Sequence, residues 1–112
     1  MGVPGFLYGT AWKEDRTQAL VTTALEVGFT GIDTANQRVH YHEAGVGEAL
    51  RLAFAAGRPR DSLFIQTKFT HRTGQDHRIP YDADAPLRTQ VRQSFASSLT
   101  HLHLETLDCY VL

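Results

Sequence analysis

Two residues of opposite charge each close a short apolar run in this chain of 112 residues. Asp33 follows Ile32, and Lys68 lies near the end of a run that begins at Leu63. Parallel strands bring their carboxyl ends together at one edge of a sheet, and enzymes built on such sheets place their reacting groups there. We therefore expect the Lys68 ammonium and the Asp33 carboxylate to lie side by side, because a partly buried ammonium needs a counter-ion.

Each of these residues also has a purely structural explanation. Lys68 could be a surface lysine whose methylene chain lies along apolar neighbours, and Asp33 could close a turn. Tyr41 lies in the segment after Asp33, and packing is the simpler role for a lone tyrosine in a loop. Beside an ammonium group, however, a phenol gives up its proton more readily, so that Tyr41 next to Lys68 could act as a proton donor.

The alternation of apolar runs and helical patterns predicts four strands and three helices. The expected strands cover residues 6–8, 29–33, 63–70 and 107–112, and the expected helices begin near residues 15, 43 and 86. Strands that alternate with helices of this length are typical of parallel βαβ units. In the third strand, Gln66 and Lys68 share a face with Phe64, and a polar face favours the mouth of a barrel over a fully buried open sheet.

The expected helices are defined by their ends and by their apolar faces. Asp15 is the expected N-cap of the first helix, and Pro86 is expected in the first turn of the third. The second helix, residues 43–56, is expected to bury one apolar face of four residues. That face is formed by Val46, Ala49, Leu50 and Ala53. The face expected to be buried in the third helix is formed by Val91, Phe95 and Leu99.

Composition excludes several classes of protein. With 42% hydrophobic residues and a net charge of −1, residues 1–112 predict one ordinary globular domain without the charge that nucleic acid or anionic membranes require. No apolar run approaches the roughly 20 residues of a membrane span. Cys109 is the single cysteine, which excludes an internal disulfide and fits a reducing compartment, so we expect a cytoplasmic protein with Cys109 buried in a strand.

Two pairs of histidines, each separated by one residue, raise the question of a metal site. The pairs are His40 with His42 and His101 with His103. Residues two apart do not share a face of a helix, and no cysteine or carboxylate completes a convincing ligand set. We therefore expect no metal ion.

Five segments, in order and at regular spacing, resemble the aldo-keto reductase family. They are residues 8–12 (YGTAW), 31–35 (GIDTA), 41–50 (YHEAGVGEAL), 65–69 (IQTKF) and 94–112 (SFASSLTHLHLETLDCYVL). The resemblance covers almost the whole chain. It implies a (β/α)8 TIM barrel, of which about the first four strands and three helices are present here. It also implies NADPH as the cofactor and a small carbonyl compound as the substrate.

The resemblance assigns roles to individual residues. Asp33, Tyr41 and Lys68 match three members of the family's catalytic tetrad, and the fourth, a histidine, is expected directly after the fourth strand, where this sequence stops at Leu112. Together with Asp33, two further residues are expected at the cofactor, against the nicotinamide ribose. These are Gly9 and Thr10.

Two assignments leave alternatives open. In many members the tyrosine is closer to the aspartate than Tyr41 is to Asp33, so that His40 could take the place of the proton donor. Trp12 is expected to line the substrate pocket, although a tryptophan in the core or on the rim is about as common. The polar loop of residues 71–85 follows the third strand and is expected to border the substrate cleft, or else to be a surface excursion.

Two functions compete. In the first, the protein reduces aldehydes or ketones to alcohols by hydride transfer: Tyr41 protonates the forming alkoxide, Lys68 assists it, and Asp33 holds Lys68. In the second, the chain is a non-catalytic truncated fragment or pseudo-enzyme that acts, if at all, as an interaction module. A closed barrel of this type needs about 250 residues, so we expect the isolated chain to show no reductase activity. The sequence does not define an oligomeric state.

Overall fold

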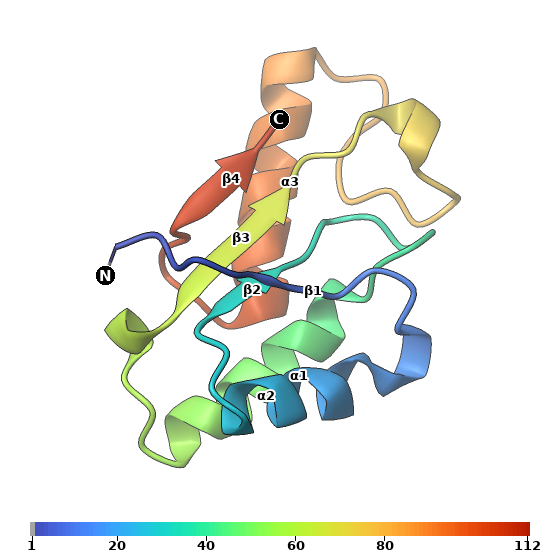
Figure 1. The fold of residues 1–112 in the computed structure, drawn as a ribbon. Helices are drawn as coiled ribbons and strands as arrows, with labels where there is room; N and C mark the ends of the chain where they lie inside the picture. The colour runs from blue at the N-terminus through green and yellow to red at the C-terminus, as the bar shows by residue number, and fades with distance from the viewer. Residues whose placement is uncertain (1) are drawn as a thin grey trace.

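The computed structural model describes residues 2–112 and contains four strands, three α-helices and three short 3₁₀ turns (Figure 1). The strands are β1 (Tyr8–Gly9), β2 (Gly31–Asp33), β3 (Phe64–Lys68) and β4 (Cys109–Val111). The α-helices are α1 (Thr17–Glu26), α2 (Glu43–Ala55) and α3 (Leu87–Leu102), and the 3₁₀ turns are Glu14–Arg16, Arg60–Ser62 and Arg72–Gly74. The expected alternation of strands and helices is therefore confirmed.

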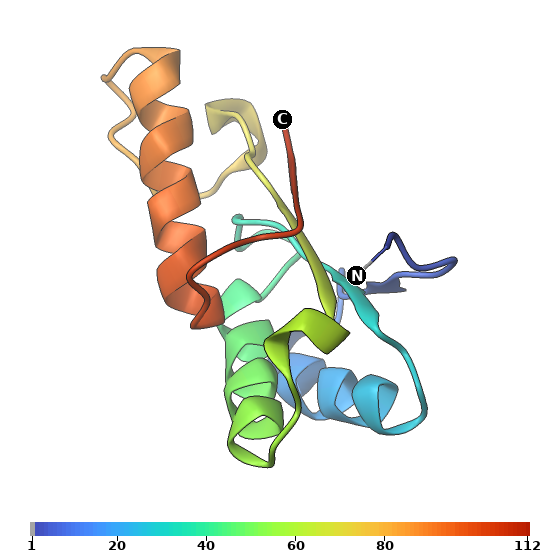
Figure 2. The same ribbon diagram turned by 90° about the vertical axis from the view of Figure 1, so that its left-hand side faces the viewer.

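All strand pairs are parallel, and the strands follow one another across the sheet in chain order, β1-β2-β3-β4. The helices lie on one side of this sheet, and the opposite side is open, as Figure 2 shows. In the register of the sheet, Gly9 pairs with Asp33, Asp33 with Gln66, and Gln66 with Cys109. The side chains at the carboxyl ends of these strands consequently meet at one end of the sheet.

The core lies between the sheet and the helices. Its buried members are Val21, Leu25, Ile32, Val46, Ala49, Leu50, Leu63, Ile65, Leu102 and Leu104. The expected alternation along β3 is confirmed, because Ile65 and Thr67 are fully buried whereas Gln66 and Lys68 are partly exposed. The expected buried face of α2 is also confirmed, with Ala53 partly buried at its end.

The expected buried face of α3 is wrong by one position. Its fully or largely buried residues are Gln90, Ser94, Ser98 and Leu102. The three apolar residues of the expected face are only partly buried beside them. The physical reason is a close approach of helices, because a Cβ atom at Gly47 of α2 would lie 1.7 Å from the carbonyl oxygen of His101. Small side chains fit at such a contact, and large ones are displaced to its flank.

Some expected ends also differ from the structure. Asp15 is not an N-cap but lies in the 3₁₀ turn before α1, where the Thr17 hydroxyl donates a hydrogen bond to the carbonyl oxygen of Glu14. Phe6 was expected in the first strand but is 80% exposed and lies before β1. Pro86 occupies the position just before α3. Cys109 belongs to β4 as expected but is only half-buried.

Side-chain hydrogen bonds hold the segment between β3 and α3 against the carboxyl end of the sheet. The side-chain amide of buried Gln75 donates to the carbonyl oxygens of Asn36 (3.0 Å) and Thr70 (3.2 Å). The Tyr81 hydroxyl also donates to the Thr70 carbonyl oxygen, and its ring packs on Phe69. Among residues 2–112, no helix has the length and apolar character that crossing a membrane requires.

Candidate active site

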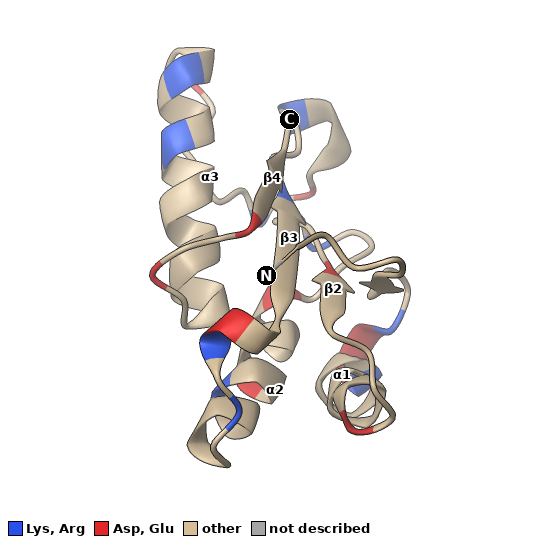
Figure 3. Cartoon of the chain, turned by 60° about the vertical axis from the view of Figure 1, so that its left-hand side comes forward, with Lys and Arg blue, Asp and Glu red and all other residues tan. Residues whose placement is uncertain are grey.

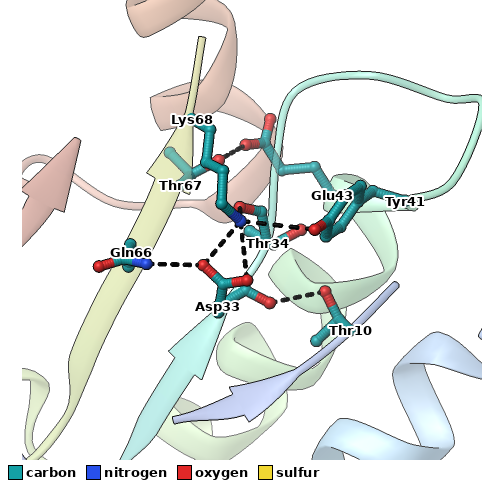
Figure 4. Close-up of polar contacts among 8 residues, drawn as sticks. All are labelled: Thr10, Asp33, Thr34, Tyr41, Glu43, Gln66, Thr67 and Lys68. Atoms are coloured by element: carbon teal, nitrogen blue, oxygen red, sulfur yellow. Dashed lines mark hydrogen bonds and ion pairs between the residues drawn. The ribbon is translucent and has the colours of Figure 1, made fainter. Parts of the chain in front are cut away.

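The expected ion pair joins the ends of β2 and β3, where acidic (red) and basic (blue) segments of the ribbon adjoin in Figure 3. The Lys68 ammonium donates to both carboxylate oxygens of Asp33, each at 2.7 Å, and to the carbonyl oxygen of Thr34 at 3.0 Å (Figure 4). The two side chains are 26% and 19% exposed, respectively. This ammonium is therefore held in one place, at the edge of solvent.

The Asp33 carboxylate is itself fixed by a neighbouring strand. The Gln66 amide donates to its Oδ1 atom at 2.8 Å, from the same face of β3 as Lys68. The backbone on either side is equally constrained, since the Thr10 hydroxyl donates to the Asp33 carbonyl oxygen and the Thr34 N–H to the Gln66 carbonyl oxygen. Three hydrogen bonds reach the carboxylate, so its orientation is determined by the sheet and not by a flexible loop.

Tyr41 reaches the same place from the segment before α2. Its hydroxyl lies 3.5 Å from the Lys68 Nζ atom, and that nitrogen lies 4.9 Å from the centre of the Tyr41 ring. His40 lies elsewhere: its ring packs against Trp12 at 4.3 Å, and its Nδ1 atom is 3.2 Å from the Gln37 amide nitrogen. The structure thus brings Tyr41, and not His40, to Lys68.

A small hollow of about 210 Å³ adjoins Tyr41. Trp12 and His40 form one part of its lining, and its charged members carry both signs, namely Arg38, Arg78, Glu14 and Asp15. Trp12 is 67% exposed, has a positive φ of 62°, and donates its backbone N–H to the His40 carbonyl oxygen. Arg78 comes from the segment after β3, so that segment borders the hollow.

The two residues expected at the cofactor differ in their surroundings. Gly9 is exposed, and a Cβ atom there would meet nothing within 4 Å. Thr10 is fully buried, and its hydroxyl is already bonded to the Asp33 carbonyl oxygen. The space where a Gly9 side chain would lie is therefore open, whereas the Thr10 side chain is buried and bonded to the backbone of β2.

Glu43, the first residue of α2, was missed as a candidate from the sequence. Its carboxylate is 2% exposed and is surrounded by three donors. These are the hydroxyls of Thr67 (2.5 Å) and Ser98 (2.9 Å) on one oxygen and His101 Nδ1 (2.8 Å) on the other. An acidic residue at the start of a helix usually interacts with the helix dipole in solvent, and its partners here lie 24 to 58 residues away, so no local pattern marks it.

The histidines are distributed among different contacts. His101 contacts Glu43, and His103 contacts Glu48 at 3.2 Å. Within residues 2–112, no group of three histidine, cysteine, aspartate or glutamate side chains is placed to hold a metal ion.

Comparison with known proteins gives one consistent result. The family model described as Aldo/keto reductase family matches residues 5–112. Methylglyoxal reductase DkgA of Yersinia pestis is 36% identical over 96 residues, which is 86% of this chain and 28% of the relative. An aldo-keto reductase of Mycobacterium ulcerans is 35% identical over 112 residues, which is 100% of this chain and 32% of the relative.

Solved structures agree. The aldose reductase of Schistosoma japonicum has a TM-score of 0.75 at 30% identity, covering 98% of this chain and 33% of that one. An aldo-keto reductase of Bombyx mori in complex with NADP has a TM-score of 0.74 at 28% identity, covering 96% and 33%. The expected fold, part of a (β/α)8 TIM barrel, is thereby confirmed, and the chain spans about a third of the length of these relatives.

Proposed function

Since this chain belongs to the aldo/keto reductase family, we propose that it carries the Asp33, Tyr41 and Lys68 part of the active site of an NADPH-dependent carbonyl reductase. The observation that supports the proposal most directly is the Lys68 ammonium, held between both oxygens of Asp33 and 3.5 Å from the Tyr41 hydroxyl. This order, from a hydroxyl to a cation to a fixed counter-ion, supports the proposal because alcohol formation needs a proton donor assisted by a cation.

The proposed chemistry divides between the cofactor and the protein. NADPH, when bound, supplies a hydride to the carbonyl carbon. The Tyr41 hydroxyl gives its proton to the carbonyl oxygen as negative charge develops there, and the Lys68 ammonium stabilises the phenolate that remains. Asp33 keeps that ammonium in place. Gly9 leaves space beside the pair for the nicotinamide end of the cofactor.

The substrate class is proposed from the relatives and from the hollow. Several relatives are named methylglyoxal reductases, so a small dicarbonyl compound is the first substrate to test. The hollow beside Tyr41, about 210 Å³, is of a size for a small molecule, and Trp12 offers it an apolar wall. The lone cysteine, Cys109, is compatible with the reducing cytoplasm as the place of action.

The test is kinetic and is made in a full-length reductase that carries this segment. Lys68→Met and Tyr41→Phe are each expected to reduce NADPH consumption with methylglyoxal by at least about 10²-fold, because each removes a group that acts on the transferred proton. NADPH binding, followed by its fluorescence, is expected to persist in both variants.

Two matched controls sharpen this test. Lys13 is the only other lysine of the 112-residue segment, so Lys13→Met is expected to leave the rate unchanged. His40→Gln is likewise expected to remain active. An active Tyr41→Phe variant together with an inactive His40→Gln variant would identify His40 as the donor. Activity that survives Lys68→Met would reject the proposed site and support a non-catalytic role for this segment.

A further inference from the structure

We infer that Glu43, buried on the opposite side of the sheet from the ion pair, is a positioning residue that fixes Tyr41 relative to Lys68 through its hydrogen bond to Thr67. The inference rests on the proposed function of Tyr41 and Lys68. It adds to that function a buried hydrogen bond that keeps the two side chains in contact. Figure 4 shows the arrangement, with Thr67 directed toward Glu43 and Lys68 directed toward Asp33.

The geometry follows from the alternation of β3. Thr67 and Lys68 are consecutive, so their side chains leave the strand on opposite faces, one toward the helices and one toward the site. Tyr41 stands two residues before Glu43, at the entrance to α2. Thr67 is one residue from Lys68, and Glu43 is two residues from Tyr41. The hydrogen bond between Thr67 and Glu43 therefore joins the two chain segments close to Lys68 and Tyr41.

The Tyr41 end of the contact is held by this join on the α2 side and, on the other side, by the hydrogen bond from the Trp12 N–H to the His40 carbonyl oxygen. Lys68 is held by three oxygen acceptors on β2 and the residue after it, but Tyr41 belongs to a segment outside the sheet. The Tyr41 hydroxyl stands 3.5 Å from the ammonium, at the limit of a hydrogen bond. A shift of the start of α2 by about 1 Å would break the contact and, in an enzyme, cost about 10²-fold in rate.

The carboxylate is suited to hold this position. It is fully surrounded, and its burial makes loss of a donor costly. Ser98 and His101 of α3 anchor it from the other side, while Thr67 alone ties it to the sheet. Thr67 and Ser98 both donate to the Oε2 atom of Glu43, so that removal of the Ser98 hydroxyl is a matched control for removal of the Thr67 hydroxyl.

The experiment measures the contact itself and needs no activity. In the 112-residue chain with labelled lysine and tyrosine, the Tyr41 ring protons and the Lys68 side-chain methylene protons are expected to show a nuclear Overhauser effect. With only Lys13 and Lys68 present, Lys13→Arg assigns the lysine signals. Thr67→Val, which keeps the shape and removes the hydroxyl, is expected to abolish or strongly weaken this effect.

Three comparisons decide the result. Thr67→Ser restores the hydroxyl and is expected to retain the effect. Ser98→Ala removes the other hydroxyl from the same oxygen and is also expected to retain it, because the tie to the sheet remains. Glu48→Gln, on the exposed part of α2, is expected to change nothing.

The outcomes separate this inference from the proposed function. Equal loss of the Overhauser effect in Thr67→Val and Ser98→Ala would show a general packing defect and overturn the inference. An unchanged effect in Thr67→Val would also overturn it, and so would the absence of the effect in the parent chain. Should Thr67→Val fail to fold, Glu43→Gln provides the second test. Its neutral amide oxygen can still accept from Thr67, and it is expected to keep the contact, whereas loss of the contact in the folded variant would contradict the inference. A kinetic failure of the tests on Lys68 and Tyr41 would leave these spectroscopic results standing.

Discussion

Lys68 has more oxygen partners than an exposed lysine requires. Three oxygens lie within 3.0 Å of its nitrogen, and two belong to one carboxylate. Such a pair stabilises the fold more than a surface ion pair does, because solvent reaches it only in part. It is not fully buried, so removing its charges from water costs less than it would in the core. Asp33 therefore has a structural role in addition to the catalytic role that we propose for it.

We expect Asp33→Asn to destabilise the chain by about 1–2 kcal/mol, a value between those of exposed and fully buried pairs. The amide keeps the shape but leaves the ammonium without a counter-ion. Urea unfolding measures the loss. Asp61→Asn, at an exposed position, is the control and is expected to stay within about 0.5 kcal/mol of the parent. Equal stability of Asp33→Asn and the parent would show that the pair contributes nothing to folding.

The shifted pKa of His42, the residue after Tyr41, predicts that the stability of the fold depends on pH. Burial lowers the pKa of His42 below its usual value of 6.5, and the nearby Arg38 guanidinium lowers it further. Below about pH 6.5 the unfolded chain takes up a proton before the folded chain does. The contribution of neutral His42 is thus fully present above about pH 6.5 and is lost as the pH falls through the folded-state pKa.

The variant His42→Gln is accordingly expected to show a flatter stability profile between neutral pH and about pH 5 than the parent. Denaturant midpoints at several pH values measure it. His77→Gln, at an exposed histidine of the segment after β3, should keep the slope of the parent. A parent profile that rises as the pH falls through this range would contradict the assignment.

At the residue scale, sequence reasoning succeeded where a side chain's neighbours follow from the sheet. The pairing of Asp33 with Lys68 could be predicted because both close strands that must lie side by side. Glu43 could not, because its partners come from two other elements and meet it only once the helices are packed. For Tyr41, the residues alone left packing and an approach to Lys68 both open, since a residue outside the sheet has no register, and the family resemblance favoured the approach.

At the scale of elements, the contact between α2 and α3 determines which residues face inward. Gly47 and the small residues of α3 allow the two helices to approach, and they displace Phe95 to the flank, where its ring packs on Tyr110 at 5.2 Å. When the buried face of α3 is assigned from its apolar residues alone, the assignment is one residue away from the face that the structure buries. The face of α2 was predicted correctly where it is apolar, at Val46, Ala49 and Leu50, but not at its buried first residue, Glu43.

Gly47→Ala is expected to lower the free energy of unfolding by about 2–3 kcal/mol. A methyl group cannot fit 1.7 Å from the His101 carbonyl oxygen, so the helices must separate, and this cost exceeds the gain of about 1 kcal/mol in helix propensity. Chemical denaturation measures the change. Gly9→Ala is the control, since nothing lies within 4 Å of the added atom, and it should be neutral or slightly stabilising. Stabilisation of Gly47→Ala would show that the helices are not in close contact.

At the scale of the whole molecule, the chain forms a curved sheet covered on one side. The alternation of strands and helices was enough to predict a parallel arrangement, and the polar face of β3 was enough to favour a barrel over an open sheet. The boundaries were less predictable. The ends of short strands depend on pairing with neighbours, and β4 pairs only where β3 lies opposite, from Gln66 to Lys68.

The isolated 112-residue chain is expected to consume no NADPH with methylglyoxal. It spans about a third of the length of its relatives, and a closed barrel needs about 250 residues to complete the walls of a cofactor site. Spectrophotometry of NADPH measures this, with a full-length relative as the positive control. Consumption that disappears on Lys68→Met would show instead that the four strands are sufficient.

The order of the strands also has a consequence for how the protein is made. Each strand pairs with the one synthesised just before it, so that no strand waits for a distant partner. Each pairing closes a segment that contains a helix, with Asp33 and Lys68 35 positions apart in the sequence, so that it forms more slowly than a hairpin but needs only chain that has already been made. As the polypeptide leaves the ribosome, the sheet can therefore grow in step with translation, and the pairing of Asp33 with Lys68 can be established as soon as β3 has emerged.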